Sequence, residues 1–155
     1  MSEPGDVETV ERVIPAPAEK IFALIADPTR HHDIDGSGTV RECKHTPERL
    51  TLGSKFGMKM KMGIPYSMVS EVIEFEDGRL IAWQSRPPSK IGSTIGGGRI
   101  WRYELEPTEG GTLVRESWDI SQEKIKAIVK PARKRTRENM EKTLARIEEL
   151  VTTAA

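Results

Sequence analysis

The side chain best placed for acid–base chemistry is that of Glu116. It stands two positions before Trp118 in the alternating run 112 to 120, so both side chains share one face of a predicted strand. A carboxylate among large apolar neighbours is either paired or protonated, because burial raises its pKa. A protonated Glu116 would suit the proton transfers of a cyclase or dehydratase. The alternatives are an ion pair with Arg99 or Arg102, or a carboxylate that faces water with Trp118 lying across the surface.

A second polar group is the run HHDID, from His31 to Asp35, and His45 is the only histidine elsewhere. Facial iron triads combine a His-x-Asp pair with a distant histidine, and they present the pair on a rigid strand. Here the pair follows a helix in a polar connection, so we expect no metal and a solvated or helix-capping cluster. His32 and Tyr66 are weaker candidates than Glu116 for moving protons.

Large apolar side chains alternate with lysines and small residues between Lys55 and Met68. They are Phe56, Met58, Met60, Met62, Ile64, Tyr66 and Met68. Alternate side chains leave a strand on the same side, so this set predicts one apolar face. Packed against a helix, the face is plain core. Along a cavity it is an adaptable wall, because an unbranched thioether adjusts to ligands of different shape. Both interpretations stay open.

The overall charge of the chain does not favour binding to nucleic acid. Lys plus Arg and Asp plus Glu number 24 each, so no net field favours nucleic acid. Seven basic residues lie between Lys124 and Arg137. They are typical of the wet side of an amphipathic helix. The alternative is contact with anionic lipid headgroups or with a phosphate-bearing ligand. We expect any membrane contact through this segment to be transient at most. RNA binding would require interleaved exposed aromatics, which this segment lacks.

The cysteine content limits which disulfides and metal sites the chain can form. Cys43 is the only cysteine, which excludes an internal disulfide and a multi-thiolate metal site and favours a reducing, cytoplasmic location. We also find no apolar run that would serve as a signal peptide or span a bilayer.

The glycines at 96 to 98 lead into a strand, whereas a phosphate loop leads into a helix. We expect a mobile hairpin there, over a cavity entrance.

The elements that must position these residues can be predicted from periodicity and turn chemistry. Strands are expected over 7–14, 39–45, 55–62, 66–75, 79–85, 98–106 and 112–120, with turns short enough to demand antiparallel neighbours. A short helix should follow Pro17 and end near Asp27. After Ile120 the apolar period lengthens to between three and four, which predicts a long helix. Ser121 is expected to cap it, and Pro131 to kink it.

Several stretches together resemble one family. They are VERVIPAPAEKIFALIADPTRHHDIDGSG, GGGRIWRYELEPTEGGTLVRESWDIS and RENMEKTLARIEELV. The chain resembles the START-like, or SRPBCC, superfamily in its polyketide cyclase/dehydrase and lipid-transport branch. The resemblance implies an α+β helix-grip fold, in which a seven-stranded curved antiparallel sheet wraps around a long C-terminal helix, with two short helices after the first strand. It also implies a deep cavity for apolar ligands, with the ligand entrance near the loop that carries HHDID.

We therefore predict a single domain over residues 1–155, with flexible ends at 1–6 and 152–155, that binds or transports a small to medium hydrophobic molecule. The expected ligand contacts are Phe56, Met58, Met60, Met62, Tyr66, Met68, Trp83, Trp101, Tyr103, Trp118, Met140 and Leu144. No cofactor or metal is expected. Two alternatives remain: a polyketide cyclase or dehydratase that uses cavity acids and bases, and a protein-interaction or regulatory module. A homodimer is also left open.

Overall fold

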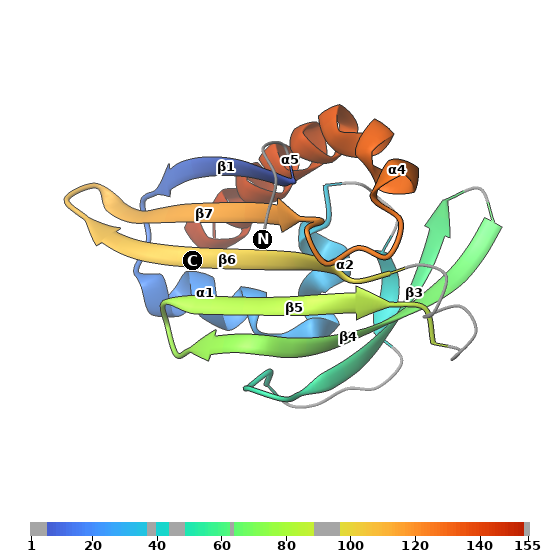
Figure 1. Ribbon diagram of the computed structural model, residues 1–155. Coiled ribbons are helices and arrows are strands. Elements are labelled where there is room, and N and C mark those ends of the chain that lie inside the picture. Colours follow the sequence, from blue (N-terminus) through green and yellow to red (C-terminus); the bar gives the residue numbers. More distant parts are fainter. Residues whose placement is uncertain (1–5, 37–39, 44–48, 63, 89–96, 154–155) are drawn as a thin grey trace.

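The computed structural model describes residues 6–36, 40–43, 49–62, 64–88 and 97–153 (Figure 1). The first part of the chain forms β1 (Val7–Ile14), α1 (Ala18–Ile25), the 3₁₀ turn η1 (Pro28–Arg30), α2 (His31–Ile34) and β2 (Val40–Cys43). Five longer strands follow: β3 (Lys55–Met62), β4 (Ile64–Glu76), β5 (Leu80–Arg86), β6 (Arg99–Thr108) and β7 (Gly111–Asp119). The chain closes with α4 (Lys126–Val129), the 3₁₀ turn η2 (Lys130–Ala132) and α5 (Arg133–Thr152).

The seven strands form one antiparallel sheet in the order β1-β7-β6-β5-β4-β3-β2. Consecutive strands from β2 to β7 are neighbours, and three of these pairs, β3–β4, β4–β5 and β6–β7, are joined by only one to three residues, as in antiparallel hairpins. β1 joins the far side by pairing with β7, where Val7 lies opposite Asp119 and Ile14 opposite Thr112. The predicted α+β fold with a curved antiparallel sheet and a long C-terminal helix is confirmed.

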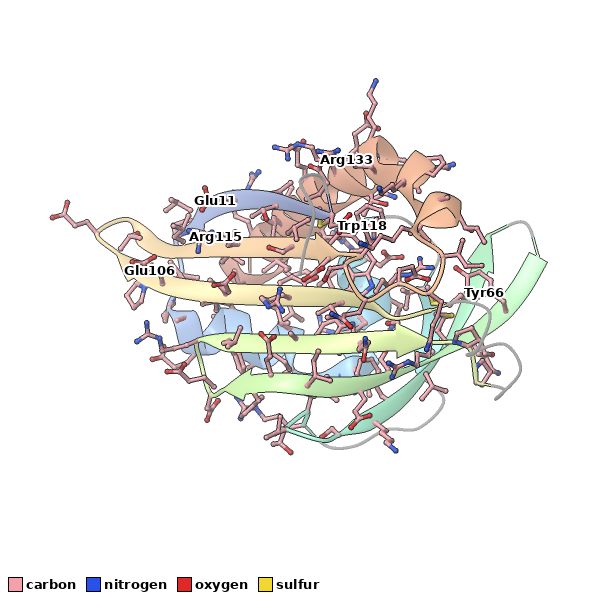
Figure 2. The ribbon with its side chains drawn as sticks, viewed as in Figure 1. Glu11, Tyr66, Glu106, Arg115, Trp118 and Arg133 are labelled. Carbon is pink, nitrogen blue, oxygen red and sulfur yellow. The ribbon has the colours of Figure 1, made fainter. Side chains whose placement is uncertain are left out.

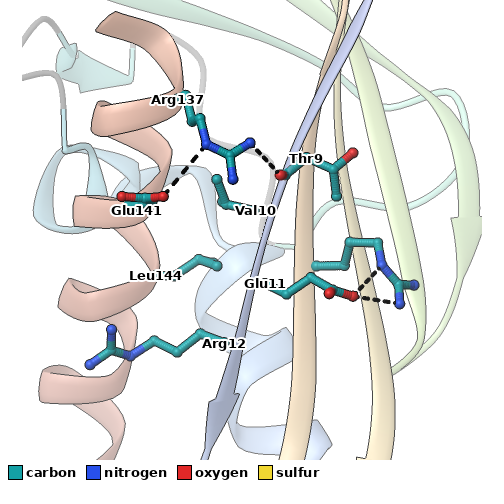
Figure 3. Close-up of a pocket in the computed structure, with 8 residues that line it drawn as sticks. Thr9, Val10, Glu11, Arg12, Arg137, Glu141 and Leu144 are labelled. Carbon is teal, nitrogen blue, oxygen red and sulfur yellow. Dashed lines mark hydrogen bonds and ion pairs between the residues drawn. The ribbon is translucent and has the colours of Figure 1, made fainter. Parts of the chain in front are cut away.

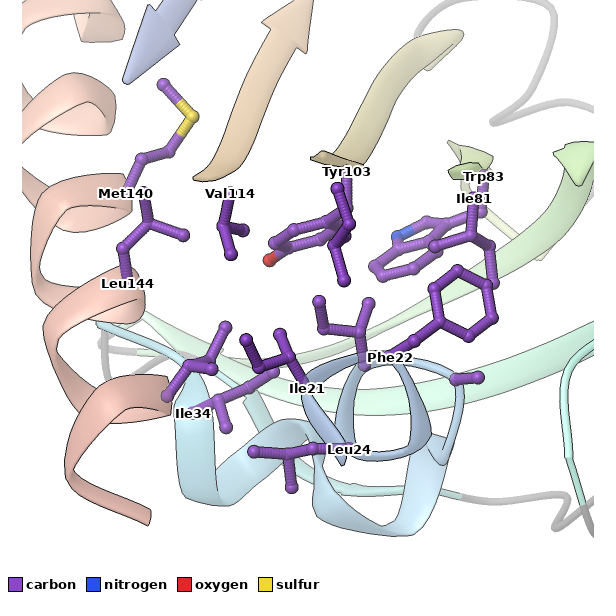
Figure 4. Close-up of a cluster of buried hydrophobic side chains, with 14 of the residues drawn as sticks. Ile21, Phe22, Leu24, Ile34, Ile81, Trp83, Tyr103, Val114, Met140 and Leu144 are labelled. Carbon is purple, nitrogen blue, oxygen red and sulfur yellow. The ribbon is translucent and has the colours of Figure 1, made fainter. Parts of the chain in front are cut away.

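The helices cover one face of this sheet. α5 crosses that face beside β1 and β7, and α1 and α2 lie on the same side (Figure 1). Apolar side chains from the sheet, from α5, and from α1 and α2 meet there (Figure 4). Among them are Ile21 and Phe22 of α1, Ile34 of α2, Ile81 of β5, Tyr103 of β6, Val114 of β7, and Met140 and Leu144 of α5. Beneath α1 the space between sheet and helices is therefore filled with protein.

The start of the C-terminal helix corrects one expectation. Ser121 does not cap a helix, because its backbone N–H and hydroxyl both donate to Asp119 Oδ1, at 2.9 and 2.6 Å, and close a local turn. The first helical turn is α4, beginning at Lys126. Pro131 lies within η2, where it interrupts the helix as predicted, and α5 then runs for 20 residues.

Among the residues that the structure describes, no helix is both long enough and apolar enough to cross a bilayer.

Candidate functional site

A cavity of about 510 Å³ lies between the concave face of the sheet and the N-terminal half of α5. Its walls come from β2 to β7 on one side and from α2, α4 and α5 on the other. Tyr66, near the tip of the β3–β4 hairpin, and Ile128 of α4 both line it and are exposed, so its mouth lies between these two elements (Figures 1 and 2). Trp118 of β7 lines the buried part and is 1% exposed.

Aromatic rings make up much of the buried wall. Trp83 of β5 is stacked on His31 with ring centroids 4.9 Å apart, and it also lies 5.6 Å from the rings of Phe56 and Tyr103. His31 is buried, its Nε2 lies 2.8 Å from the carbonyl oxygen of Ile25, and burial lowers its pKa. The imidazole is therefore neutral at pH 7 and donates from Nε2, acting as one more flat wall element.

Glu116 is the buried acid of this cavity. Its side chain is 2% exposed, and its Oε2 accepts a hydrogen bond of 3.0 Å from the hydroxyl of Tyr103. Its Oε1 is buried and has no hydrogen-bond partner among the described residues. Burial raises the pKa of Glu116 to about 8, with the hydrogen bond from Tyr103 acting against this rise and the charge of Asp35 adding to it. Glu116 is therefore protonated at neutral pH.

The ion pairs considered for Glu116 are not formed. Arg102 binds Glu74 at 2.7 Å, with Asp119 at 3.6 Å. The Nε of Arg99 lies 3.5 Å from Glu123 Oε2. Both arginines are thus held by other carboxylates.

The structure brings most of the predicted ligand contacts together. Those that line the cavity are Phe56, Met58, Met60, Tyr66, Met68, Trp83, Trp101, Tyr103, Trp118 and Met140. The side chain of Met62 lies outside the described residues. Leu144 does not line the cavity, because it lies further along α5, packed into the filled core. His32 also lies elsewhere: it is exposed and its Nε2 is 3.1 Å from Asp33 Oδ1.

Sequence reasoning missed several polar wall residues. Ser70 and Ser85 share a hydrogen bond of 2.8 Å across β4 and β5, and both line the cavity. α5 adds Thr136, Asn139 and Thr143. Thr136 and Thr143 lie four and three positions from Met140, so helical spacing was a signal for these two. Arg99, which also lines the cavity, had no such signal, whereas Asp35 belongs to the HHDID run that the resemblance places near the ligand entrance.

A second hollow lies between α5 and β1 (Figure 3). It measures about 610 Å³, and charged side chains form most of its rim. These charges bind one another: Arg115 lies 2.7 Å from Glu11, and Arg137 lies 3.7 Å from Glu141. Because the rim charges of this hollow are already paired, the cavity of about 510 Å³ between the sheet and α5 is the better candidate for a ligand site.

Two further expectations concern a metal site and the hairpin at the glycine run 96 to 98. Among the described residues, no group of three or more histidine, cysteine, aspartate or glutamate side chains is arranged to hold a metal ion. The hairpin expected at the glycine run lies mostly outside the described residues. Its end is described: Gly98 donates from its backbone N–H to Ser85 at 2.9 Å.

Comparisons with known proteins agree with this architecture. The sequence model of the family described as "Polyketide cyclase / dehydrase and lipid transport" matches residues 7–152. A relative, the uncharacterized protein Rv0088 of Mycobacterium tuberculosis, is 42% identical over 120 residues, which are 75% of this chain and 48% of that protein. The chain thus spans about half the length of this relative.

Solved structures show the same fold at low sequence identity. The crystal structure of protein CV1439 from Chromobacterium violaceum superposes with a TM-score of 0.72 at 17% identity, over 96% of this chain and 99% of that one. DynU16, from the dynemicin biosynthetic locus, superposes with a TM-score of 0.68 at 13% identity, over 97% of this chain and 48% of that one. On the strength of the family match, the chain belongs to the polyketide cyclase/dehydrase and lipid transport family of the START-like (SRPBCC) superfamily.

Proposed function

We propose that the protein binds a small to medium hydrophobic molecule in the cavity between its sheet and α5, and carries or sequesters it. The observation that supports this most is a space of about 510 Å³ walled by aromatic rings and thioethers. Small-molecule sites are typically about 300–1,000 Å³ and mostly apolar, so its size and chemistry both fit. Burying roughly 200 Å² of apolar ligand surface contributes about 5 kcal/mol before ordering costs.

The methionines fit the same role. Met58 and Met60 of β3 and Met68 of β4 line the cavity together with Met140 of α5. Thioethers on opposite sides of the space can adjust to ligands that differ in shape.

The test uses a neutral fluorescent probe, N-phenyl-1-naphthylamine, and a Thr136→Phe variant. Thr136 is half-buried and lines the cavity, so the larger side chain should occupy ligand space and weaken probe binding at least tenfold. Glu138→Phe makes the same addition at an exposed position of α5 and should bind normally. A panel of fatty acids, sterols and polyketides is then screened by displacement of the probe. No probe binding, or equal binding by both variants, would remove the proposal.

A second candidate is a cyclase or dehydratase, and Glu116 favours it. A protonated carboxyl with one free oxygen in an apolar cavity has the properties of a general acid. Glu116→Gln keeps the shape and removes the proton that can be transferred. Turnover of a polyketide substrate should fall at least a hundredfold, and an unchanged rate would exclude Glu116 as the acid.

We further propose a cytoplasmic location and transient membrane contact through Lys124 to Arg137. A homodimer and a role as an interaction module are two further proposals. Sedimentation of the purified protein tests the last two, because a monomer without a retained partner would count against both.

A further inference from the structure

We propose that Glu116 is the recognition group of the cavity, and that its carboxyl donates a hydrogen bond from Oε1 to a neutral oxygen, such as a ketone, on a flat and otherwise apolar ligand. This inference rests on the proposed binding function and names the class of ligand.

The hydrogen bonds of Glu116 leave one oxygen for a ligand. Oε2 already accepts from the Tyr103 hydroxyl at 3.0 Å. Oε1 is buried without a partner among the described residues, and Glu116 is one of the residues that line the cavity. Buried polar atoms in proteins are nearly always hydrogen-bonded, so an orphan oxygen on a cavity wall indicates a partner supplied from within the cavity.

The surroundings of Glu116 keep its proton in place. Asp35, after α2, lines the same cavity and disfavours a second negative charge, and Tyr103 of β6 is itself un-ionised because burial raises its pKa. His31 of α2 is neutral. The cations on this cavity are Arg99 of β6, which is 3.5 Å from Glu123, and the exposed Arg135 of α5.

A protonated carboxyl whose other oxygen accepts from Tyr103 carries its proton on Oε1. It is therefore a donor toward the cavity, and the ligand must supply an acceptor. A neutral carbonyl suits this better than a carboxylate, because an anion would be buried close to Asp35.

The walls next to Glu116 favour a planar ligand. Trp83 and Tyr103 have ring centroids 5.6 Å apart, and Trp101 and Trp118 line the same space. Flat aromatic faces stack well on flat conjugated rings. The combination of ring walls and one donor selects a conjugated ketone or quinone over a plain hydrocarbon.

Fluorenone and fluorene test this directly, since they share a tricyclic skeleton and differ in one carbonyl. Binding is measured by quenching of tryptophan fluorescence, because the three tryptophans of the chain all line the cavity. At pH 6 the wild type should bind fluorenone at least tenfold more tightly than fluorene. That preference should shrink as the pH rises past about 8, where Glu116 loses its proton, while fluorene binding stays constant.

Two variants separate recognition from folding. Glu116→Ala should lose the preference for fluorenone and still bind fluorene. Glu116→Gln should keep the preference, because its amide N–H donates in place of the acid, and should lose the pH dependence. Equal binding of the two probes by the wild type, or a preference that survives Glu116→Ala, would overturn the inference. If N-phenyl-1-naphthylamine still binds in that case, the carrier function stands and only the ligand class is wrong.

Discussion

Replacing Glu116 by glutamine should change how the stability of the folded protein depends on pH. In the unfolded chain this carboxyl has a pKa near 4.5, whereas burial raises it to about 8 in the folded state. The folded protein therefore holds a proton that the unfolded chain releases between these two values. The resulting contribution to stability is fully present below pH 4.5 and is lost progressively as the pH rises to about 8.

The size of the effect follows from the pKa difference. At about 1.4 kcal/mol per pKa unit, ionisation of Glu116 should destabilise the fold by about 3.5 kcal/mol between pH 5 and pH 8. Glutamine cannot ionise, and its amide oxygen can still accept the hydrogen bond of Tyr103. The variant should thus gain about 3.5 kcal/mol relative to the wild type over this range.

Urea unfolding followed by circular dichroism, at several pH values between 5 and 8, measures this difference. Other groups with shifted pKa values also make stability vary with pH. Burial lowers the pKa of His31, and binding to arginine lowers those of Glu8 and Glu74. All three are present in both proteins and cancel in the difference. A difference that stays constant from pH 5 to pH 8 would show that Glu116 has an ordinary pKa, and the account of the cavity acid would fail.

Three substitutions test the packing of the molecule away from the cavity. Gly111→Ala should cost about 2–4 kcal/mol in urea unfolding, because its φ is +133° and a Cβ there would lie 2.2 Å from the carbonyl oxygen of Ile14. Gly110→Ala, whose Cβ makes only ordinary contact, is the near-neutral control. Leu144→Ala should cost about 2–5 kcal/mol yet leave probe affinity unchanged, and a large loss of affinity would place Leu144 at the ligand after all. Thr112→Val should lower the melting temperature, since its buried hydroxyl donates to a backbone carbonyl at 2.8 Å and such a bond contributes about 1 kcal/mol; an unchanged melting temperature would contradict this.

The strands were predictable because two local signals coincide at their ends. The strands expected over 7–14 and 55–62 are observed with those bounds as β1 and β3. Alternation defines each strand, and Pro15 in one case and Gly63 with Pro65 in the other mark its end. Helix starts were harder to predict. Ser121 has the right chemistry for a cap, but Asp119 competes for the same serine and makes a turn.

The cavity walls were predictable only where periodicity applies. Trp83, Trp101 and Trp118 lie on three neighbouring strands, and their register places them opposite one another. Alternation within each strand shows which of its residues share a face, so the strand residues of the wall could be grouped even where, as between β5 and β6, the connection 87–98 is long. His31 and Asp35 belong to α2 and the segment after it, where no repeating pattern shows which way a side chain points. Their place against the sheet depends on tertiary packing.

The composition of α5 explains why the molecule is hollow at one end and solid at the other. The second half of its inward face carries Leu144, Ile147 and Val151, which are buried against β1, α1 and the rest of the core. Closer to the start of α5, the short polar side chains of Thr136, Asn139 and Thr143 line the cavity together with Met140.

The same end of the helix is held in place by contacts at its margin. The hydroxyl of Thr143 accepts a hydrogen bond of 2.9 Å from the backbone N–H of Gly36, and a Cβ on Gly36 would lie 2.2 Å from the carbonyl oxygen of Asn139. This close approach fixes α5 to the segment after α2. Pro131 lies in the 3₁₀ turn that separates α4 from α5, and Ile128 and Val129 of α4 line the cavity. Short side chains on a fixed helix cannot fill the space by moving closer to the sheet. The cavity is thus a consequence of which residues face inward along α5, and lengthening one of them, as in Thr136→Phe, is the direct way to close it.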